Sequence, residues 1–82
     1  MGRKERILTA LLGARADAST DFADLVYLLA QFGFEMRIKG SHHIFWKAGV
    51  DEILNLQPVG SKAKPYQVKQ VRNVIIKYRL HM

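Results

Sequence analysis

The stretch that decides the fold runs from Phe34 to Lys47 and is FEMRIKGSHHIFWK. Apolar and charged residues alternate over its first half, which predicts a half-buried strand. Its last part, HHIFWK, is rich in aromatic and branched residues and predicts a second strand. Between the two, Gly40 is followed by Ser41, and glycine suits the first central position of a two-residue type II′ turn. The stretch therefore predicts an antiparallel β-hairpin with its tip at Gly40.

A two-residue turn fixes the register of this hairpin. The expected opposed pairs are Lys39 with His42, Ile38 with His43, Arg37 with Ile44, and Met36 with Phe45. Opposed residues share one face of a sheet. We therefore expect His43 on the apolar face and His42 on the polar face, beside Arg37 and Lys39.

The two adjacent histidines then have different expected roles. His42 lies at an exposed turn among cations, which disfavour the charged imidazole and leave it able to accept a proton. His43 is expected to be structural, with its nitrogens hydrogen-bonded at the edge of the core. We expect no metal site, because adjacent strand residues point to opposite faces. The third histidine, His81, is given no role.

Helical patterns precede the hairpin. Residues 3–13 predict a short amphipathic helix, and residues 14–20, ARADAST, predict a polar linker. Thr20 or Asp21 is suited to cap a second helix that runs to Gly33, where a left-handed residue can end it. The expected buried stripe of this helix is Phe22, Leu25, Leu28, Leu29 and Phe32.

One more strand and one more helix are expected after the hairpin. EILNLQ, residues 52–57, predicts the third strand, and GSKAK, residues 60–64, predicts a basic loop. Pro65 suits the first turn of a last helix, whose expected buried stripe is Val68, Val71, Ile75 and Tyr78. The short connections imply an antiparallel three-stranded meander with helices packed on one face, an α+β layer fold. The 82 residues predict a single domain.

The distribution of charge points to a polyanionic partner. The formal net charge is +6. Seven basic and seven acidic side chains cancel over residues 1–52, whereas residues 53–82 hold six basic side chains and no acidic one. A surface of one sign attracts polyanions, of which nucleic acid is the commonest. Lys62, Lys64, Lys69 and Arg72 are the expected RNA-binding residues, and a solvated basic helix is the alternative.

Two further features bound the function. The predicted register places Ile44 and Trp46 on the outer face of the sheet, where either the N-terminal helix covers them or they form a partner-binding patch. The chain has no cysteine, which excludes thiol catalysis and cysteine-ligated zinc and fits a cytoplasmic protein. No apolar run approaches the roughly 18 residues needed to cross a membrane.

Several pieces together resemble the HicA toxins of bacterial type II toxin–antitoxin systems. These are Gly-Phe at the end of a helix, GSHH followed by Ile and Phe in a strand, and a basic loop leading into KPYQVKQVRNVI. The resemblance runs from about Asp17 to Leu80, with residues 21–80 as the core and residues 1–20 as an N-terminal extension. It implies a fold like that of double-stranded-RNA-binding domains, metal-independent cleavage of mRNA without a cofactor, and a HicB-like antitoxin as partner. It also implies that His42 is the catalytic residue.

The residues of the hairpin suit that chemistry. RNA carries its own nucleophile, the 2′-hydroxyl, and one histidine can accept its proton. Lys39, Arg37 or the backbone near Gly40 and Ser41 could stabilise charge on the phosphate, and His43 is the alternative base. A non-catalytic RNA-binding module with the same layout is the second hypothesis. A small basic protein that binds a partner through Trp46 is the third.

Overall fold

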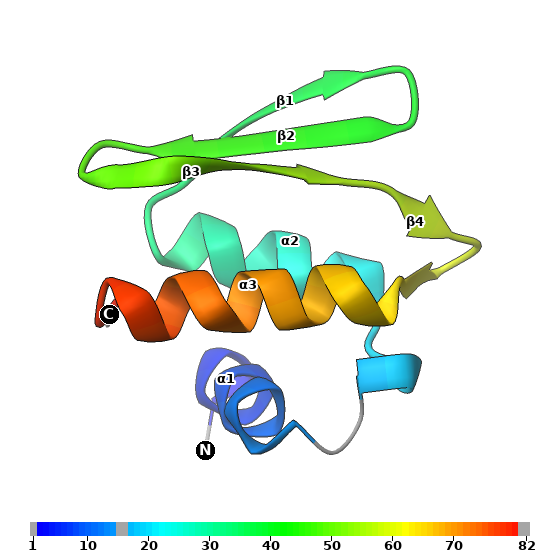
Figure 1. The fold of residues 1–82 in the computed structure, drawn as a ribbon. Helices are drawn as coiled ribbons and strands as arrows, with labels where there is room; N and C mark the ends of the chain where they lie inside the picture. Colours follow the sequence, from blue (N-terminus) through cyan, green and yellow to red (C-terminus); the bar gives the residue numbers. More distant parts are fainter. Residues whose placement is uncertain (1, 15–16, 81–82) are drawn as a thin grey trace.

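The computed structural model describes residues 2–14 and 17–80 and has three layers (Figure 1). The three-stranded sheet forms one layer, α2 and α3 lie side by side beneath it, and α1 lies beneath them. The elements in chain order are α1 (Arg3–Gly13), the 3₁₀ turn η1 (Asp17–Ser19), α2 (Phe22–Gln31), β1 (Glu35–Lys39), β2 (His42–Lys47), β3 (Val50–Leu56), β4 (Pro58–Val59), β5 (Lys62–Ala63) and α3 (Pro65–Lys77). This arrangement confirms the predicted α+β layer fold. His81 lies outside the described residues.

The hairpin has the predicted register. β1 and β2 are antiparallel, with Lys39 opposite His42, Ile38 opposite His43, Arg37 opposite Ile44 and Met36 opposite Phe45. Gly40 has a φ of 63°, in the left-handed region that the first central position of a type II′ turn requires. β3 then pairs antiparallel with the other side of β2, so the sheet order is β1-β2-β3.

The core lies between the sheet and the two inner helices. The predicted stripe of α2 is buried throughout, and so are Val68, Val71 and Ile75 of α3. From the sheet, the fully buried side chains are Phe45, Leu54 and Leu56. α1 adds Ile7 and Leu11 to the same cluster from the opposite side of the helical layer. The N-terminal helix therefore packs on the helices and does not cover the sheet.

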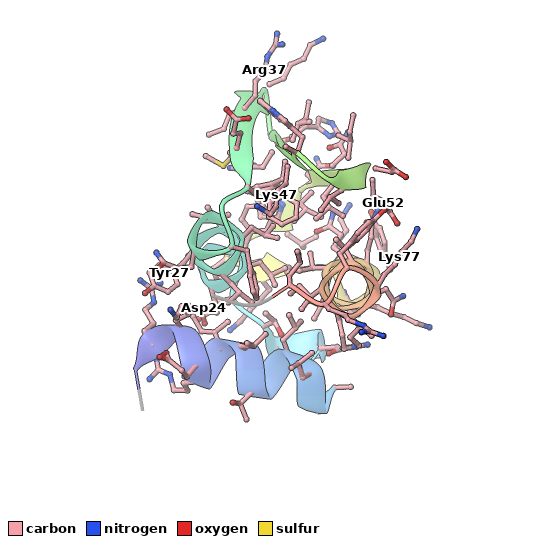
Figure 2. All side chains as sticks on the ribbon, turned by 90° about the vertical axis from the view of Figure 1, so that its left-hand side faces the viewer. Asp24, Tyr27, Arg37, Lys47, Glu52 and Lys77 are labelled. Carbon is pink, nitrogen blue, oxygen red and sulfur yellow. The ribbon has the colours of Figure 1, made fainter. Side chains whose placement is uncertain are left out.

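β1 departs from the predicted half-buried strand. Every one of its residues is exposed, and Met36 and Ile38, which share the helix-facing side with His43 and Phe45, keep 42% and 56% of their surface. The reason is the width of the helical layer, which covers β2 and β3 while β1 extends beyond it. Figure 2 shows β1 rising clear of the helices, with the side chain of Arg37, from the middle of the strand, extending away from them.

A short β-ribbon, β4 with β5, overlaps the predicted basic loop. β4 and β5 pair antiparallel, with Pro58 opposite Ala63, and the ribbon is joined to the start of α2 by backbone hydrogen bonds from Phe22 N to Ser61 O (2.9 Å) and from Ala63 N to Thr20 O (2.9 Å). Asp21 is the N-cap of α2, as the sequence suggests, but its side chain makes no cap hydrogen bond. Its carboxylate instead binds Lys62 at 2.6 Å.

The end of α3 is fastened to β3 by three polar side chains. The hydroxyl of Tyr78 donates to Glu52 Oε1 (2.5 Å) and accepts from the backbone N–H of Asp51 (3.2 Å). Lys77 Nζ binds the other carboxylate oxygen of Glu52 at 3.0 Å, and Figure 2 shows these two side chains together. The hydrogen bonds from Tyr78 and Lys77 hold the pKa of Glu52 below its ordinary value, and Glu52 raises the pKa of Lys77.

The lowered pKa of Glu52 predicts how acid affects stability. The ionised carboxylate stabilises the fold above its unfolded-state pKa, and this contribution is lost as the pH falls through the lower, folded-state pKa. Glu52→Gln should therefore lower the melting temperature at about pH 7 and have a smaller effect at about pH 3. Glu35→Gln, at an exposed carboxylate in β1, is the control and should change little. A loss for Glu52→Gln that is equally large at both pH values would contradict the assignment.

Candidate functional site

The outer face of the hairpin is open to solvent. The helices α1, α2 and α3 lie on the opposite side of the sheet (Figure 1). His42 is exposed at the start of β2, directly opposite Lys39, and Arg37 shares the same face two residues along β1. The structure thus brings His42 and the two cations onto one accessible surface, as the register predicts.

One hydrogen bond holds the ring of His42. Its Nδ1 lies 3.0 Å from the side-chain oxygen Oδ1 of Asn55 in β3. An amide oxygen only accepts, so Nδ1 is the donor and Nε2 of the neutral ring carries the lone pair. Asn55 lies opposite Ile44 in the β2–β3 register. Sequence reasoning missed Asn55, although its place in the alternating pattern of EILNLQ predicts that it shares a face with Ile44 and His42.

His43 lies on the other face, at the edge of the core. Its Nδ1 donates to the backbone carbonyl of Ser41 at 3.3 Å. Its ring packs edge-on against Phe22 of α2, with the ring centroids 4.8 Å apart and an angle of 72° between the planes. The face and the hydrogen bond agree with the structural role expected for His43.

The tip of the hairpin is fixed from β3 as well. Gln57 Nε2 donates to Ser41 Oγ at 2.8 Å, which ties the turn to the end of the sheet. A Cβ atom at Gly40 would meet no atom within 4 Å apart from those of its chain neighbours. The surface above the turn is therefore open, and a ligand could approach the backbone there closely.

An apolar patch adjoins His42 on the outer face. Ile44 and Trp46 are half-buried on this face, and α1 does not cover them, because it packs beneath the helices. Ile53 of β3 is 65% exposed and shares the outer face with Asn55 by strand alternation. Sequence reasoning did not single out Ile53. The patch of Ile44, Trp46 and Ile53 is an accessible surface of the kind that marks a partner site.

The four expected RNA-binding residues divide into two pairs. Lys62 binds Asp21 at 2.6 Å, and Arg72 Nη1 binds Asp17 at 3.0 Å. Arg72 also donates to the backbone carbonyl of Leu11, at the end of α1, at 3.3 Å, and only 12% of its side chain is exposed. Acidic side chains from earlier in the chain thus neutralise part of the basic C-terminal segment, which the sequence pattern alone did not indicate.

The other two cations are better placed for a polyanion. Lys64 precedes the first turn of α3, and Lys69 is exposed one turn later. Within residues 2–14 and 17–80, the ion pairs give neither of them an acidic partner. These two lysines therefore keep their charge available at the start of α3.

The described residues offer neither a cluster of metal ligands nor a membrane-spanning helix. No group of three or more His, Cys, Asp or Glu side chains in this part of the chain is arranged to hold a metal ion. None of the helices described here combines the length and the apolar composition that a membrane crossing needs.

Comparison with known protein families gives a match over most of the chain. The model of a family described as "HicA toxin of bacterial toxin-antitoxin" matches residues 22–77, well over half of the chain. The matched segment begins with α2 and ends with α3, so it contains the whole sheet and the hairpin with both histidines. Neither curated proteins nor solved structures give a match.

The two pairs of cations should respond differently to mutation. Arg72→Ala removes a largely buried ion pair and a hydrogen bond that together join α1, η1 and α3, and it should cost about 1–2 kcal/mol of stability. Lys69→Ala, on the exposed side of the same helix, is the matched control and should stay within about 0.5 kcal/mol. Urea unfolding of both variants measures the difference. Equal stabilities would show that Arg72 does not fasten the N-terminal helix.

Proposed function

Because this chain belongs to the HicA toxin family of bacterial toxin–antitoxin systems, we propose that it is a ribonuclease toxin that cleaves mRNA, with His42 as its catalytic base. The observation that carries the proposal is the setting of His42. It is exposed, it shares a face with Arg37 and Lys39, and its ring is oriented by Asn55.

The reaction needs few groups from the protein. Nε2 of His42 takes the proton from the 2′-hydroxyl of RNA, and the 2′-oxygen attacks the adjacent phosphorus. The bond from phosphorus to the 5′-oxygen of the next nucleotide breaks, and that oxygen takes a proton from solvent. A general base of this kind contributes roughly 10²–10⁴-fold to the rate. Because the nucleophile belongs to the substrate, the proposed mechanism requires no metal and no cofactor.

The surroundings of His42 supply positive charge for the phosphate. Lys39 and Arg37 lie on the same face and stabilise the negative charge that builds up on the phosphate oxygens. The open surface above Gly40 lets the RNA backbone approach the turn. Asn55 acts as a positioning residue, because its amide oxygen keeps the proton on Nδ1 and leaves Nε2 free to accept one.

We assign phosphate contacts along the strand to Lys64 and Lys69, which have no acidic partner among the described ion pairs. Lys62 and Arg72 are occupied by Asp21 and Asp17, and their contribution to RNA binding is expected to be smaller. The partner we propose is a HicB-like antitoxin that covers His42 together with the patch of Ile44, Trp46 and Ile53. Both proteins would act in the cytoplasm, where mRNA is found.

The two histidines provide the test of the catalytic assignment. His42→Ala should abolish cleavage of single-stranded RNA in buffer with EDTA, and it should change stability by no more than about 0.5 kcal/mol, because the residue is exposed. His43→Ala should cost about 1–3 kcal/mol, since it loses its packing on Phe22. Its cleavage should fall only with the fraction of folded protein.

Cleavage and thermal melting of both variants distinguish the outcomes. A folded but inactive His43→Ala beside a fully active His42→Ala would make His43 the base. Full activity in both would remove histidine catalysis, and a non-catalytic RNA-binding module would become the better interpretation. Activity that disappears with EDTA and returns with a divalent ion would refute the metal-independent mechanism.

The outer apolar patch is tested with an antitoxin. Trp46→Ala should weaken the complex with a HicB-like protein at least tenfold and leave the isolated toxin folded, because Trp46 lies outside the central core. Ile76→Ala removes an exposed apolar side chain of α3, 58% of which is accessible, away from the outer face of the sheet, and is the control. Unchanged affinity for folded Trp46→Ala would place the antitoxin elsewhere.

A further inference from the structure

The two edges of the sheet differ in how far other parts of the chain cover them. At the β3 edge, α3 packs alongside, and the hydroxyl of Tyr78 accepts the hydrogen bond of the backbone N–H of Asp51. At the other edge, all the residues of β1 are exposed, and Figure 2 shows the strand standing clear of both inner helices. An exposed edge strand is a ready template for another strand, so β1 is the open side of the sheet.

The register indicates which backbone groups face outward from β1. In an antiparallel ladder, hydrogen-bonded and non-hydrogen-bonded pairs alternate, and the residues of the non-hydrogen-bonded pairs direct N–H and C=O away from the partner strand. The pair that flanks a two-residue turn, Lys39 with His42, is of the hydrogen-bonded kind. Met36 and Ile38 therefore direct their backbone groups to the free edge, and neither is proline.

The same two residues carry exposed apolar side chains. Met36 and Ile38 are 42% and 56% exposed on the helix-facing side of the sheet. Ile38 lies opposite His43 in β2. A strand added beside β1 would place every second side chain on this helix-facing side, against Met36 and Ile38.

The outer face of β1 carries charged side chains, which favour a partner of complementary charge. Arg37 and Lys39 point to the outer side, on which the intervening residues of an added strand would also lie. Opposite charges across a pair are stabilising, and like charges are destabilising. Antiparallel pairing of β1 with a second copy about its centre would place Glu35 opposite Lys39 at both ends but Arg37 against Arg37 in the middle. An acidic segment opposite Arg37 and Lys39 pairs both cations, and the exposed Glu35 lies at the far end of the strand.

We propose that β1 binds an extended segment of a partner protein, which adds a fourth strand to the sheet and alternates apolar residues, beside Met36 and Ile38, with acidic residues, facing Arg37 and Lys39. This surface differs from the outer patch of Ile44, Trp46 and Ile53. It does not depend on whether the chain cleaves RNA. RNA would engage the two cations but has no strand backbone to pair with Met36 and Ile38.

The test uses ¹⁵N-labelled full-length protein and two synthetic peptides. The first alternates valine and glutamate, and the second carries lysine in place of each glutamate. The acidic peptide should shift the amide resonances of Met36 and Ile38, slow their exchange with solvent, and bind at least tenfold more tightly than the basic one. Equal binding of the two peptides would overturn the proposal. So would shifts confined to the outer patch, or a single-stranded RNA that protects the same two amides.

Two variants separate strand addition from simple charge attraction. Ile38→Pro removes the outward N–H, which an edge strand tolerates, and should abolish binding of the acidic peptide. Ile38→Val keeps both the donor and the apolar side chain and should bind normally. Arg37→Glu should shift the binding preference toward the basic peptide. If thermal melting shows that Ile38→Pro is unfolded, the peptide preference of Arg37→Glu tests the proposal instead. Retained binding by a folded Ile38→Pro, or an unchanged preference in Arg37→Glu, would refute strand addition.

Discussion

The two-residue turn at Gly40 is the constraint on which the rest of the surface depends. Its left-handed glycine, with a φ of 63°, sets Lys39 opposite His42 and thereby fixes the whole β1–β2 register. A shift of β2 by one residue relative to β1 would move every side chain of β2 to the other face. His42 would then face the helices, and His43 would face solvent beside the cations of β1.

A second constraint is the small size of the core. A domain of about this length covers only part of its apolar surface, and here the two inner helices cover β2 and β3 but not β1. The surface that remains is divided by the register into two faces. The outer face carries His42 with the patch of Ile44, Trp46 and Ile53. The inner face of β1 carries the exposed apolar side chains of Met36 and Ile38. Toxins of this family have an antitoxin as partner, and both of these faces are accessible to a partner protein.

The local features were predictable because each depends on neighbours in the chain. Glycine at the turn, strict alternation in the strands and the helical stripes of α2 and α3 indicated the register, the sheet and the core. The exposure of β1 was not predictable from its alternating pattern, because that pattern indicates which side is apolar and not whether a helix lies there. The short β4–β5 ribbon was not predicted from the sequence either. Its strands have two residues each and flank a turn that contains Gly60, so the sequence of this segment resembles that of a loop.

The long-range polar contacts were also beyond local reasoning. Asp17 and Arg72 are 55 residues apart, and Asp21 and Lys62 are 41 apart. Along the sequence, residues 53–82 contain basic side chains and no acidic ones. In the folded chain, Asp21 and Asp17 from the N-terminal part form ion pairs with Lys62 and Arg72 of this segment. Asn55 likewise reaches His42 only because β2 and β3 pair. The fold and the face of each histidine could therefore be predicted from the sequence. The hydrogen-bond and ion-pair partners of the site residues became evident only in the tertiary structure.

The central claim is that a histidine on this hairpin activates the 2′-hydroxyl of RNA without a metal ion. The chemistry at the ends of the cleaved RNA tests it most directly. Mass spectrometry of a defined oligonucleotide, digested in EDTA, should find a 2′,3′-cyclic phosphate on the upstream fragment and a free 5′-hydroxyl on the downstream fragment. These are the products of attack by the 2′-oxygen. A 5′-phosphate with a free 3′-hydroxyl would show that water attacked the phosphorus, and it would contradict the account.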